Sequence, residues 1–471
     1  MSREALKPLP AIEMAYGLAP EQLKMRASEL EDITSVTIDE LFPCIESATR
    51  KSDKDIAKET LEALSTVDLS HIKKDDKVNI LASHHGFTLL GGFAYAQMLR
   101  TIKDEINRRT GCSNVWLIAG NGLRFNESEA YIKQHGLTEY FEGKVKNVSP
   151  IDEGIEIETE IGVLYGLKEV YNADWIIHAH NNDMREIHFH RGVDRIVKPF
   201  GMSYARKETR AAYHQFMFPR GSNFIARAIY NSEFVQKKFA CSVILRINPT
   251  GIAGIDADND LIRQSGRITE ISLKEFGYIT TLFNEMNDEE GCIAIIDAPT
   301  PMPYAPAATI IFGVLYNMGL DLFDLRKGFT LLSEVGHLRK YANEAEKEKL
   351  PALSGSLKCI INNYCFTGYP NTEFTAVPSI IVSEELRELF ELDPQNYRYV
   401  KNSLVAPDLN IAVKLAKRMT GCDRIIVFDG AQAGINVSRS MREYMLQKAP
   451  EVKKKVDEEL LPMWLMQRGL K

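Results

Sequence analysis

Five of the ten histidines of this chain lie in one short stretch that also contains Lys198: His178, His180, His188, His190 and His214. Imidazole is the commonest side-chain metal ligand, and it is the side chain best suited to moving a proton near neutral pH. A lysine amine adds a nucleophile that can be covalently modified when burial or neighbouring cations make it less basic. This combination indicates an active site, with His188, Lys198 and His214 at its centre.

Five arginines flank Lys198 in the sequence: Arg185, Arg191, Arg195, Arg206 and Arg210. Guanidinium groups pair with phosphate or carboxylate in two-pronged geometry, so this density favours an anionic ligand. Arg191 and Arg195 lie in a predicted loop around Gly192 and are the stronger candidates for binding it. Arg206 and Arg210 fit better on the solvated face of a helix.

The histidines also allow a different class of enzyme. His178 and His180, like His188 and His190, are two residues apart, which places both imidazoles on one face of an extended backbone. A metal-dependent hydrolase could use such pairs, although the chain has no HExxH or comparable zinc motif. Taken one by one, these four histidines are more often satisfied residues of a core or an interface.

The 471 residues are too many for one ordinary domain, so we expect two, residues 1–268 and 269–471. The formal net charge of -7 argues against general nucleic-acid binding. Seven cysteines are scattered without CxxC spacing, which is typical of a reducing compartment. Neither a signal-peptide pattern nor an apolar run of membrane-spanning length is found, and we therefore expect a cytoplasmic protein without a membrane partner.

Two apolar runs with a helical segment between them predict a strand–helix–strand unit. Residues 78–82 and 115–119 have the strand pattern, and residues 90–108 have helical spacing. Such a unit favours a parallel sheet, whose ligands bind just beyond the strand ends. This rule selects His84, His85 and Arg124. On a continuing strand His84 and His85 would face opposite sides, so at most one would enter a pocket.

The remaining pattern predicts further α/β structure. We expect a hairpin over 142–168, a helix over 204–216, a final charged helix, and strands at residues 174–177, 242–246, 292–296, 378–382 and 423–428. The stretch 251–260, rich in Asp and Gly, is expected to lead up to the domain boundary at 268. The predicted fold class is α/β, with two domains, each a mostly parallel sheet flanked by helices, and the site in the cleft between them.

The order and spacing of the central residues resemble the signature of the nickel-pincer lactate racemase family. The segment 186–192 contains a His188-Phe189 pair, Lys198 follows ten residues after His188, and His214 follows sixteen residues after Lys198. The likeness extends from about Lys77 to Asn436. The chain therefore resembles a divergent member of that family.

The resemblance implies a cofactor and a reaction. The cofactor would be the nickel-pincer nucleotide (pyridinium-3,5-bisthiocarboxylic acid mononucleotide nickel), joined covalently to Lys198, with His214 as nickel ligand and Arg191 and Arg195 helping to bind it. His188 would act as general base while a hydride leaves the substrate's carbinol carbon. The chain would then be an isomerase, a racemase or epimerase of a 2-hydroxy acid. Its implied partners are that hydroxy acid and cofactor-maturation proteins, and a homo-oligomer is left open.

The chain departs from the family at two positions. Leu123 stands where the racemases have a second catalytic histidine, directly before Arg124, and Phe87 stands where they have a substrate-binding arginine. His84 or His85 would then be the second acid/base, with Arg124 helping to bind an anion. A substrate larger or less charged than lactate fits these changes better. The alternatives are the metal-dependent hydrolase and a non-catalytic relative that binds the cofactor.

Overall fold

The structure, a computed structural model, describes most of the chain. The described residues are 25–48, 51–87, 92–121, 127–182, 194–215, 221–286, 289–297, 321, 323–326, 355–364, 377–392, 394–429, 431 and 433–471. The residues discussed above that lie outside these ranges are Leu123, Arg124, Arg185, His188, Phe189, His190, Arg191 and Gly192.

The first sheet has six strands in the order β4-β3-β2-β7-β8-β9. All neighbouring pairs are parallel except β8 and β9, which are antiparallel. The strands are β2 (Val78–Ser83), β3 (Val115–Gly120), β4 (Val145–Val148), β7 (Trp175–Asn181), β8 (Phe239–Asn248) and β9 (Gly251–Asp258).

Helices cover both faces of this sheet, which explains its continuous apolar runs. Ile80 belongs to the core cluster that also contains residues of α2 (Asp53–Ser65) and α4 (Phe93–Thr110), whereas its neighbour Leu81 belongs to the cluster on the opposite face. That second cluster includes residues of α8 (Lys198–Gly201), α10 (Gly221–Asn231) and the first half of α12 (Leu261–Asn284). The alternation along β2 therefore divides its side chains between two helical layers.

The second sheet has seven strands in the order β1-β15-β14-β10-β11-β12-β13. The five strands from β14 to β13 are parallel, and β15 and β1 are antiparallel additions at one edge. The strands are β1 (Ile33–Thr37), β10 (Cys292–Ile296), β11 (Leu357–Asn362), β12 (Ser379–Val382), β13 (Leu404–Ala406), β14 (Ile425–Phe428) and β15 (Gly434–Ser438). Two mostly parallel sheets flanked by helices confirm the predicted α/β class.

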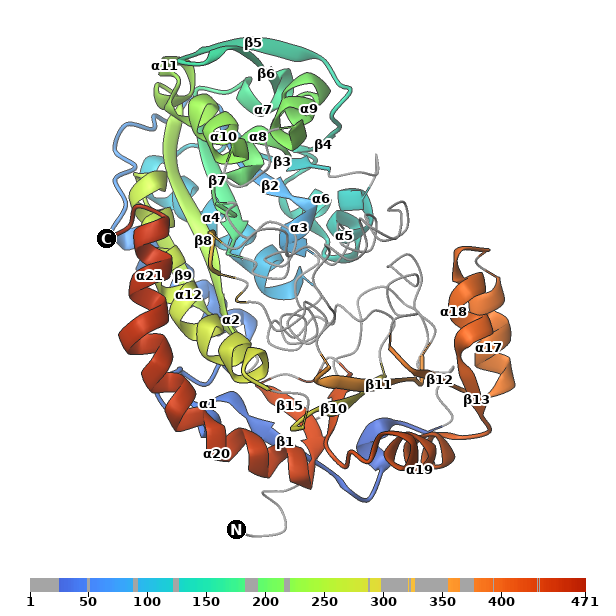
Figure 1. The fold of residues 1–471 in the computed structure, drawn as a ribbon. Helices are drawn as coiled ribbons and strands as arrows, with labels where there is room; N and C mark the ends of the chain where they lie inside the picture. Colours follow the sequence, from blue (N-terminus) through green and yellow to red (C-terminus); the bar gives the residue numbers. More distant parts are fainter. Residues whose placement is uncertain are drawn as a thin grey trace.

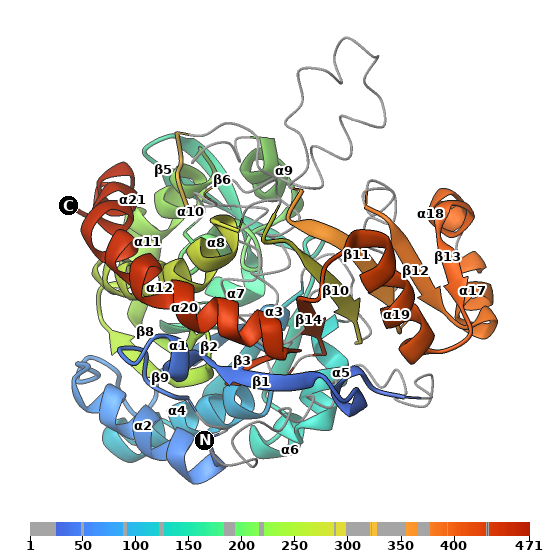
Figure 2. The ribbon, with the colours of Figure 1, turned by 60° about the horizontal axis from the view of Figure 1, so that its bottom comes forward.

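The other helices are mostly short. Within the described ranges they are α1 (Ile38–Leu41), α3 (His84–Phe87), α5 (Glu127–Gln134), α6 (Leu137–Tyr140), α7 (Lys168–Tyr171), α9 (Lys207–Gln215), α11 (Glu233–Gln236), α17 (Glu384–Glu391), α18 (Tyr397–Asn402), α19 (Leu409–Thr420), α20 (Arg439–Lys455) and α21 (Leu461–Gln467). Figure 2 shows α17, α18 and β13 together at one end of the seven-stranded sheet.

One long helix, α12, contributes to the cores of both sheets. Figure 1 shows α12 running beside α20 and α21 along one side of the molecule, and these helices contact each other. Ile268 belongs to the core of the first sheet and Phe276 to the core of the second, so α12 serves both. Residue 268, the expected domain boundary, lies inside this helix, and β1 from the N-terminal part joins the second sheet. The division into 1–268 and 269–471 stays a prediction.

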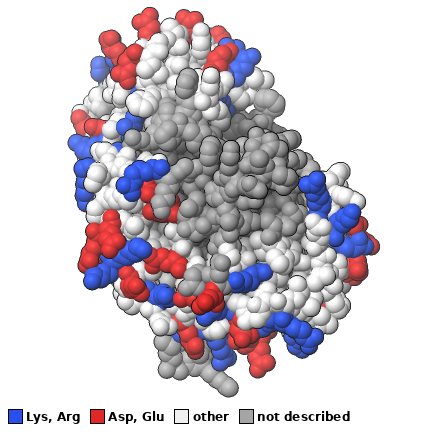
Figure 3. Space-filling model, in the orientation of Figure 1, with Lys and Arg blue, Asp and Glu red and all other residues white. Residues whose placement is uncertain are grey.

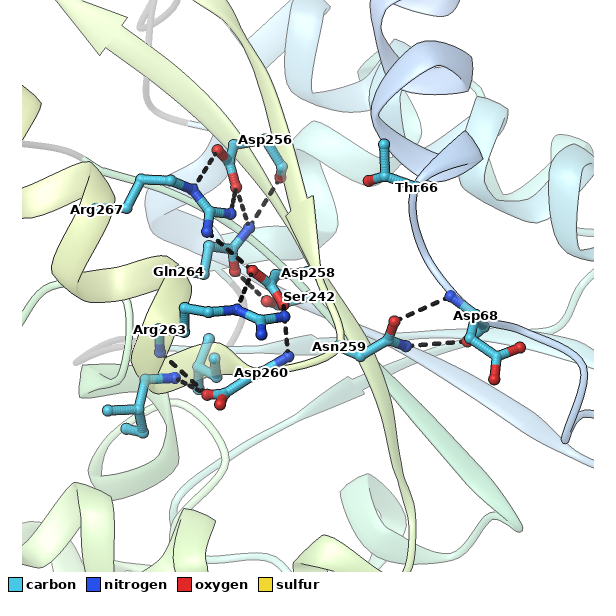
Figure 4. Close-up of polar contacts among 12 residues, drawn as sticks. Thr66, Asp68, Ser242, Asp256, Asp258, Asn259, Asp260, Arg263, Gln264 and Arg267 are labelled. Atoms are coloured by element: carbon cyan, nitrogen blue, oxygen red, sulfur yellow. Dashed lines mark hydrogen bonds and ion pairs between the residues drawn. The ribbon is translucent and has the colours of Figure 1, made fainter.

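The strand β9 differs from the sequence prediction. The stretch 251–260 was expected to be a boundary segment, but most of it pairs antiparallel with β8. Figure 4 shows how its acidic side chains are used: Asp256 and Asp258 form ion pairs with Arg267, and Asp258 also pairs with Arg263 of α12. The aspartates of this stretch therefore attach the sheet to α12.

Hairpin β5 (Gly154–Thr159) and β6 (Gly162–Leu167) confirms the hairpin expected over 142–168. On the face shown in Figure 3, Lys and Arg are interspersed with Asp and Glu over the described surface. None of the described helices is both long enough and apolar enough to cross a membrane.

Candidate active site

The topology of the six-stranded sheet singles out one place for a ligand. The chain runs from β2 through β3 to β4 on one side and then places β7 on the other side of β2. The strand order therefore reverses between β2 and β7, whose carboxyl ends lie side by side because the strands are parallel. Open α/β sheets bind ligands outside the carboxyl ends of the strands at such a switch point.

Ser83 ends β2 and Asn181 ends β7, and polar side chains meet there. The Ser83 hydroxyl lies 3.3 Å from Nδ1 of His180, across the two strands. The side-chain amide of Asn181 donates to the backbone carbonyl of His85 at 3.3 Å. His180 and Asn181 are both buried.

His84 and His85 lie on one helical turn and not on a continuing strand, which corrects the expectation that they face opposite sides. They begin α3, and their ring centroids are 3.9 Å apart. A Cβ on Gly86 would lie 2.2 Å from the ring of Tyr95, whose hydroxyl donates to the carbonyl of Ala179 in β7. This close packing fixes the turn against the sheet and keeps both imidazoles beside the switch point.

Lys198 is brought to the same edge by a capped turn. The backbone N–H of Lys198 donates to the Asp194 carbonyl at 2.9 Å, and Oδ1 of Asp194 accepts from the backbone N–H groups of Ile196 and Val197. Ser265 of α12 also donates to Oδ1 of Asp194, at 2.7 Å. The turn that places Lys198 is therefore attached to α12, and Lys198 itself is buried.

These elements line a small pocket that is partly open to solvent. Two cationic side chains, two imidazoles and the amide of Asn181 line it, and the described lining residues contain no carboxylate. The full lining is His85, His180, Asn181, Arg195, Lys198, Pro199, Met202 and Ser203. A pocket of this composition suits an anionic ligand.

The two histidines of β7 have different surroundings. Burial lowers the pKa of His178 to about 3, so its ring is neutral, and both of its nitrogens are within 2.9 Å of a partner, the Ile196 carbonyl and the Tyr204 hydroxyl. Burial also holds the pKa of His180 well below its ordinary value, and the neighbouring ionisable groups Arg195 and Lys198 lower it further. His178 is part of the core, whereas His180 lines the pocket.

His214 is not among the residues that line this pocket. It is exposed near the end of α9, and its Nδ1 lies 2.7 Å from the carbonyl of Arg210. Helix α9 packs closely on α8 at Gly201. A Cβ at that position would lie only 2.6 Å from the ring of Tyr213. Because a carbonyl only accepts, Nδ1 must carry a proton to make this hydrogen bond, so in the neutral ring the lone pair is on Nε2. That is the usual state of a histidine that binds a metal.

The arginines expected on a solvated helix face are used inside the fold. Arg210 is buried and donates to the carbonyls of Ala205 and Asn121, the latter at the end of β3. Arg206 donates to the Asp152 carbonyl and pairs with Glu208. Phe87 is fully buried against Tyr95, so it is a core residue and not a substrate-binding one.

The structure therefore brings four of the predicted site residues to one edge of the sheet: His84, His85, Arg195 and Lys198. Sequence reasoning did not select Asn181 or Asp194, and it counted His180 only as one of a metal-binding pair. Extending the predicted strand 174–177 by four residues would have placed His180 and Asn181 at its carboxyl end. In the described part of the chain, no three His, Cys, Asp or Glu side chains form a group that could bind a metal ion.

The sequence matches no protein-family model and no curated protein. Among solved structures, the fold is similar to that of the lactate racemase apoprotein from Thermoanaerobacterium thermosaccharolyticum, with a TM-score of 0.43 and 15% identity. The match covers 91% of this chain and 99% of that chain. At this identity and TM-score the likeness does not indicate function, which has to be inferred from the residues of this chain.

Proposed function

We propose that this protein is a racemase or epimerase of a 2-hydroxy acid and that it carries a nickel-pincer nucleotide on Lys198. One observation carries the proposal: Lys198 is buried in a cation-rich pocket at the β2–β7 switch point. A lysine in that position is placed for covalent attachment of an anionic ligand and not for solvation. The spacing from His188 to Lys198 to His214 supports the same assignment.

The described residues fit such a cofactor. Lys198 would hold it covalently, Arg195 would pair with its phosphate or with a substrate carboxylate, and His214 would ligate nickel through Nε2. The hydrogen bond of His214 Nδ1 to the Arg210 carbonyl fixes the tautomer that this role requires. When bound, the cofactor supplies a reversible hydride acceptor.

The protein side chains would then bind the acid and move its hydroxyl proton. Arg124 would help to bind the carboxylate, and Arg195 would pair with it or with the cofactor phosphate. His188 would take the hydroxyl proton as general base and return it when the carbonyl is reduced. His188, Arg124 and Arg191 lie outside the described residues, so their roles stay predictions, as does the role of His84 and His85.

The hydrolase alternative is weaker. It depends on paired histidines, but the Ile196 carbonyl and the Tyr204 hydroxyl already use both nitrogens of His178. His178 could bind a metal only after one of these contacts in the core is broken. No described residue favours this reading over the first.

The test uses full-length protein produced together with the cofactor-maturation proteins. Enantiopure 2-hydroxy acids carrying deuterium at C2 are incubated with it, and chirality and deuterium content are measured by chiral chromatography with mass detection. Racemisation with retention of deuterium supports hydride transfer, and Lys198→Arg should abolish it. Racemisation with loss of deuterium to solvent contradicts the proposed chemistry. Binding of the cofactor with no turnover of any acid would favour the alternative, a non-catalytic relative that binds the cofactor.

A further inference from the structure

His178 and His180 are two residues apart on β7, but only one of them can change its protonated nitrogen easily. The Ile196 carbonyl, which can only accept, fixes the proton of His178 on Nε2. His180 has a serine as its partner instead, with Ser83 Oγ 3.3 Å from Nδ1. A hydroxyl donates as well as accepts. His180 can therefore present either a lone pair or an N–H at Nε2 without losing its hydrogen bond.

The position of His180 makes that freedom relevant to the ligand. Within the described part of the chain, its single hydrogen bond is made through Nδ1, which leaves Nε2 to the pocket that the ring lines. Lys198 and Arg195 line the same pocket. The site that would hold a tethered cofactor and an anionic substrate thus includes an imidazole able to give and take a proton.

Four ionisable groups face His180. They are His178 on its own strand, His84 on α3, Arg195 on the turn before α8, and Lys198 on α8. Apart from the neutral His178, these groups are cationic or become cationic on protonation, so they oppose a positive charge on His180. Joining Lys198 to a cofactor through an amide-type bond leaves its nitrogen uncharged.

We propose that His180 exchanges the hydroxyl proton of the substrate in this pocket, and that it does so only once Lys198, which lines the same pocket, has been covalently modified. This inference rests on the proposed function and names the second acid/base group that the change to Leu123 requires. His180 would thus exchange no substrate proton until the cofactor is attached to Lys198. His180 is chosen over His84 and His85 because its hydrogen-bond partner, the Ser83 hydroxyl, lets Nε2 either accept or donate.

The proton balance is simple. Nε2 of His180 would accept the proton of the substrate hydroxyl as the carbon–hydrogen bond breaks, and the bound cofactor would supply the acceptor for the hydride, which leaves with the electron pair of that bond. The imidazolium then donates through Nδ1 to Ser83 Oγ. When the hydride returns to the carbonyl carbon, a histidine returns a proton to the oxygen, His180 for one orientation of the hydroxyl and His188 for the other. Exchange of protons with solvent restores both rings, so no proton or electron is gained or lost overall.

The first test needs no cofactor. Full-length protein with ¹³C,¹⁵N-labelled histidine is titrated by NMR, and the His180 signals are assigned by their loss in His180→Gln. Lys198→Met imitates the loss of charge on modification, and it should raise the pKa of His180 by about one unit. Lys168→Met removes a lysine that pairs with Glu153 on the exposed surface, and it should leave the pKa of His180 unchanged. An equal pKa in Lys198→Met and wild type would overturn the inference.

The second test uses loaded protein. His180→Gln should lower kcat at least about 100-fold with little change in KM, as expected for loss of an acid/base group. Ser83→Ala, which keeps the imidazole, should shift the pH profile of kcat and reduce the rate less. Unchanged kcat in His180→Gln would refute the role of His180. Absence of turnover in loaded wild type would instead refute the proposed function, while the NMR titration would still decide the coupling of Lys198 to His180.

Discussion

Asp194 offers the sharpest test of how the fold places Lys198. Its carboxylate accepts from the backbone N–H groups of Ile196 and Val197, from Ser265 at 2.7 Å, and from Arg227 at 3.1 Å. The Asp194 side chain is 8% exposed and that of Arg227 is 44% exposed, so the ion pair itself contributes little. Loss of the cap costs about 1 kcal/mol, and loss of the buried hydrogen bond to a charged group costs about 1.5–3 kcal/mol.

We therefore expect Asp194→Ala to reduce the free energy of unfolding by about 2–4 kcal/mol. Asp194→Asn keeps an acceptor oxygen for the cap and should cost about 1 kcal/mol. Asp260→Ala is a matched control, because Asp260 caps α12 through the N–H groups of Ile262 and Arg263 but does not line the pocket. That variant should also cost about 1 kcal/mol.

The assay is urea unfolding followed by circular dichroism, with the midpoint and slope compared among the three variants. A second readout is the fraction of Lys198 modified after production with the maturation proteins. Asp194→Ala should lower that fraction, whereas Asp260→Ala should not. The reasoning fails if Asp194→Ala is no less stable than Asp260→Ala, or if it is less stable and Lys198 is still modified to the wild-type extent.

Three further predictions follow from buried groups elsewhere in the chain. Burial raises the pKa of Asp297 to about 7, and the neighbouring Asp429 carboxyl adds to this. Wild type should therefore lose about 2–4 kcal/mol of stability between about pH 4 and pH 7 relative to Asp297→Asn, measured by urea unfolding across that range. Burial alone would raise the pKa of Asp258, but hydrogen bonds, chiefly from Arg263, outweigh it and lower the pKa to about 2. Asp258→Asn should cost about 1–2 kcal/mol at pH 7 and progressively less as the pH falls from about 4 towards 2, a trend that thermal unfolding at each pH would reveal or exclude. Gly86→Ala would place a methyl group against the Tyr95 ring and should cost about 1–3 kcal/mol; an unchanged unfolding midpoint would show that α3 adapts.

The strands that sequence reasoning found are those whose apolar runs are buried on both faces. Residues 78–82, 115–119 and 292–296 are continuous apolar runs because helices cover both sides of their sheets. The strands β1, β9, β11, β13 and β15 were not predicted. β1 pairs with β15, which lies about 400 residues further along the chain, and no local pattern encodes such a pairing.

The site was also predicted only in part, because some of its residues depend on contacts between distant segments of the chain. Lys198, Arg195, His84 and His85 were selected from residue type and spacing, and the structure places them at one edge of the six-stranded sheet. His180 was not selected because the predicted strand ended at Ile177. The strand continues because Tyr204 and the Ile196 carbonyl satisfy His178 inside the core, and these contacts come from later in the chain. Spacing alone could not distinguish the core histidine from the one that lines the pocket.

The central claim is that Lys198 carries a nickel-containing cofactor, and one measurement tests it most directly. Protein is taken from its native host and digested gently, the peptide containing Lys198 is weighed, and metal is determined on the same sample. The account predicts an added mass on Lys198 together with about one nickel per chain. An unmodified Lys198 in protein that binds zinc or manganese, or no metal at all, would contradict it.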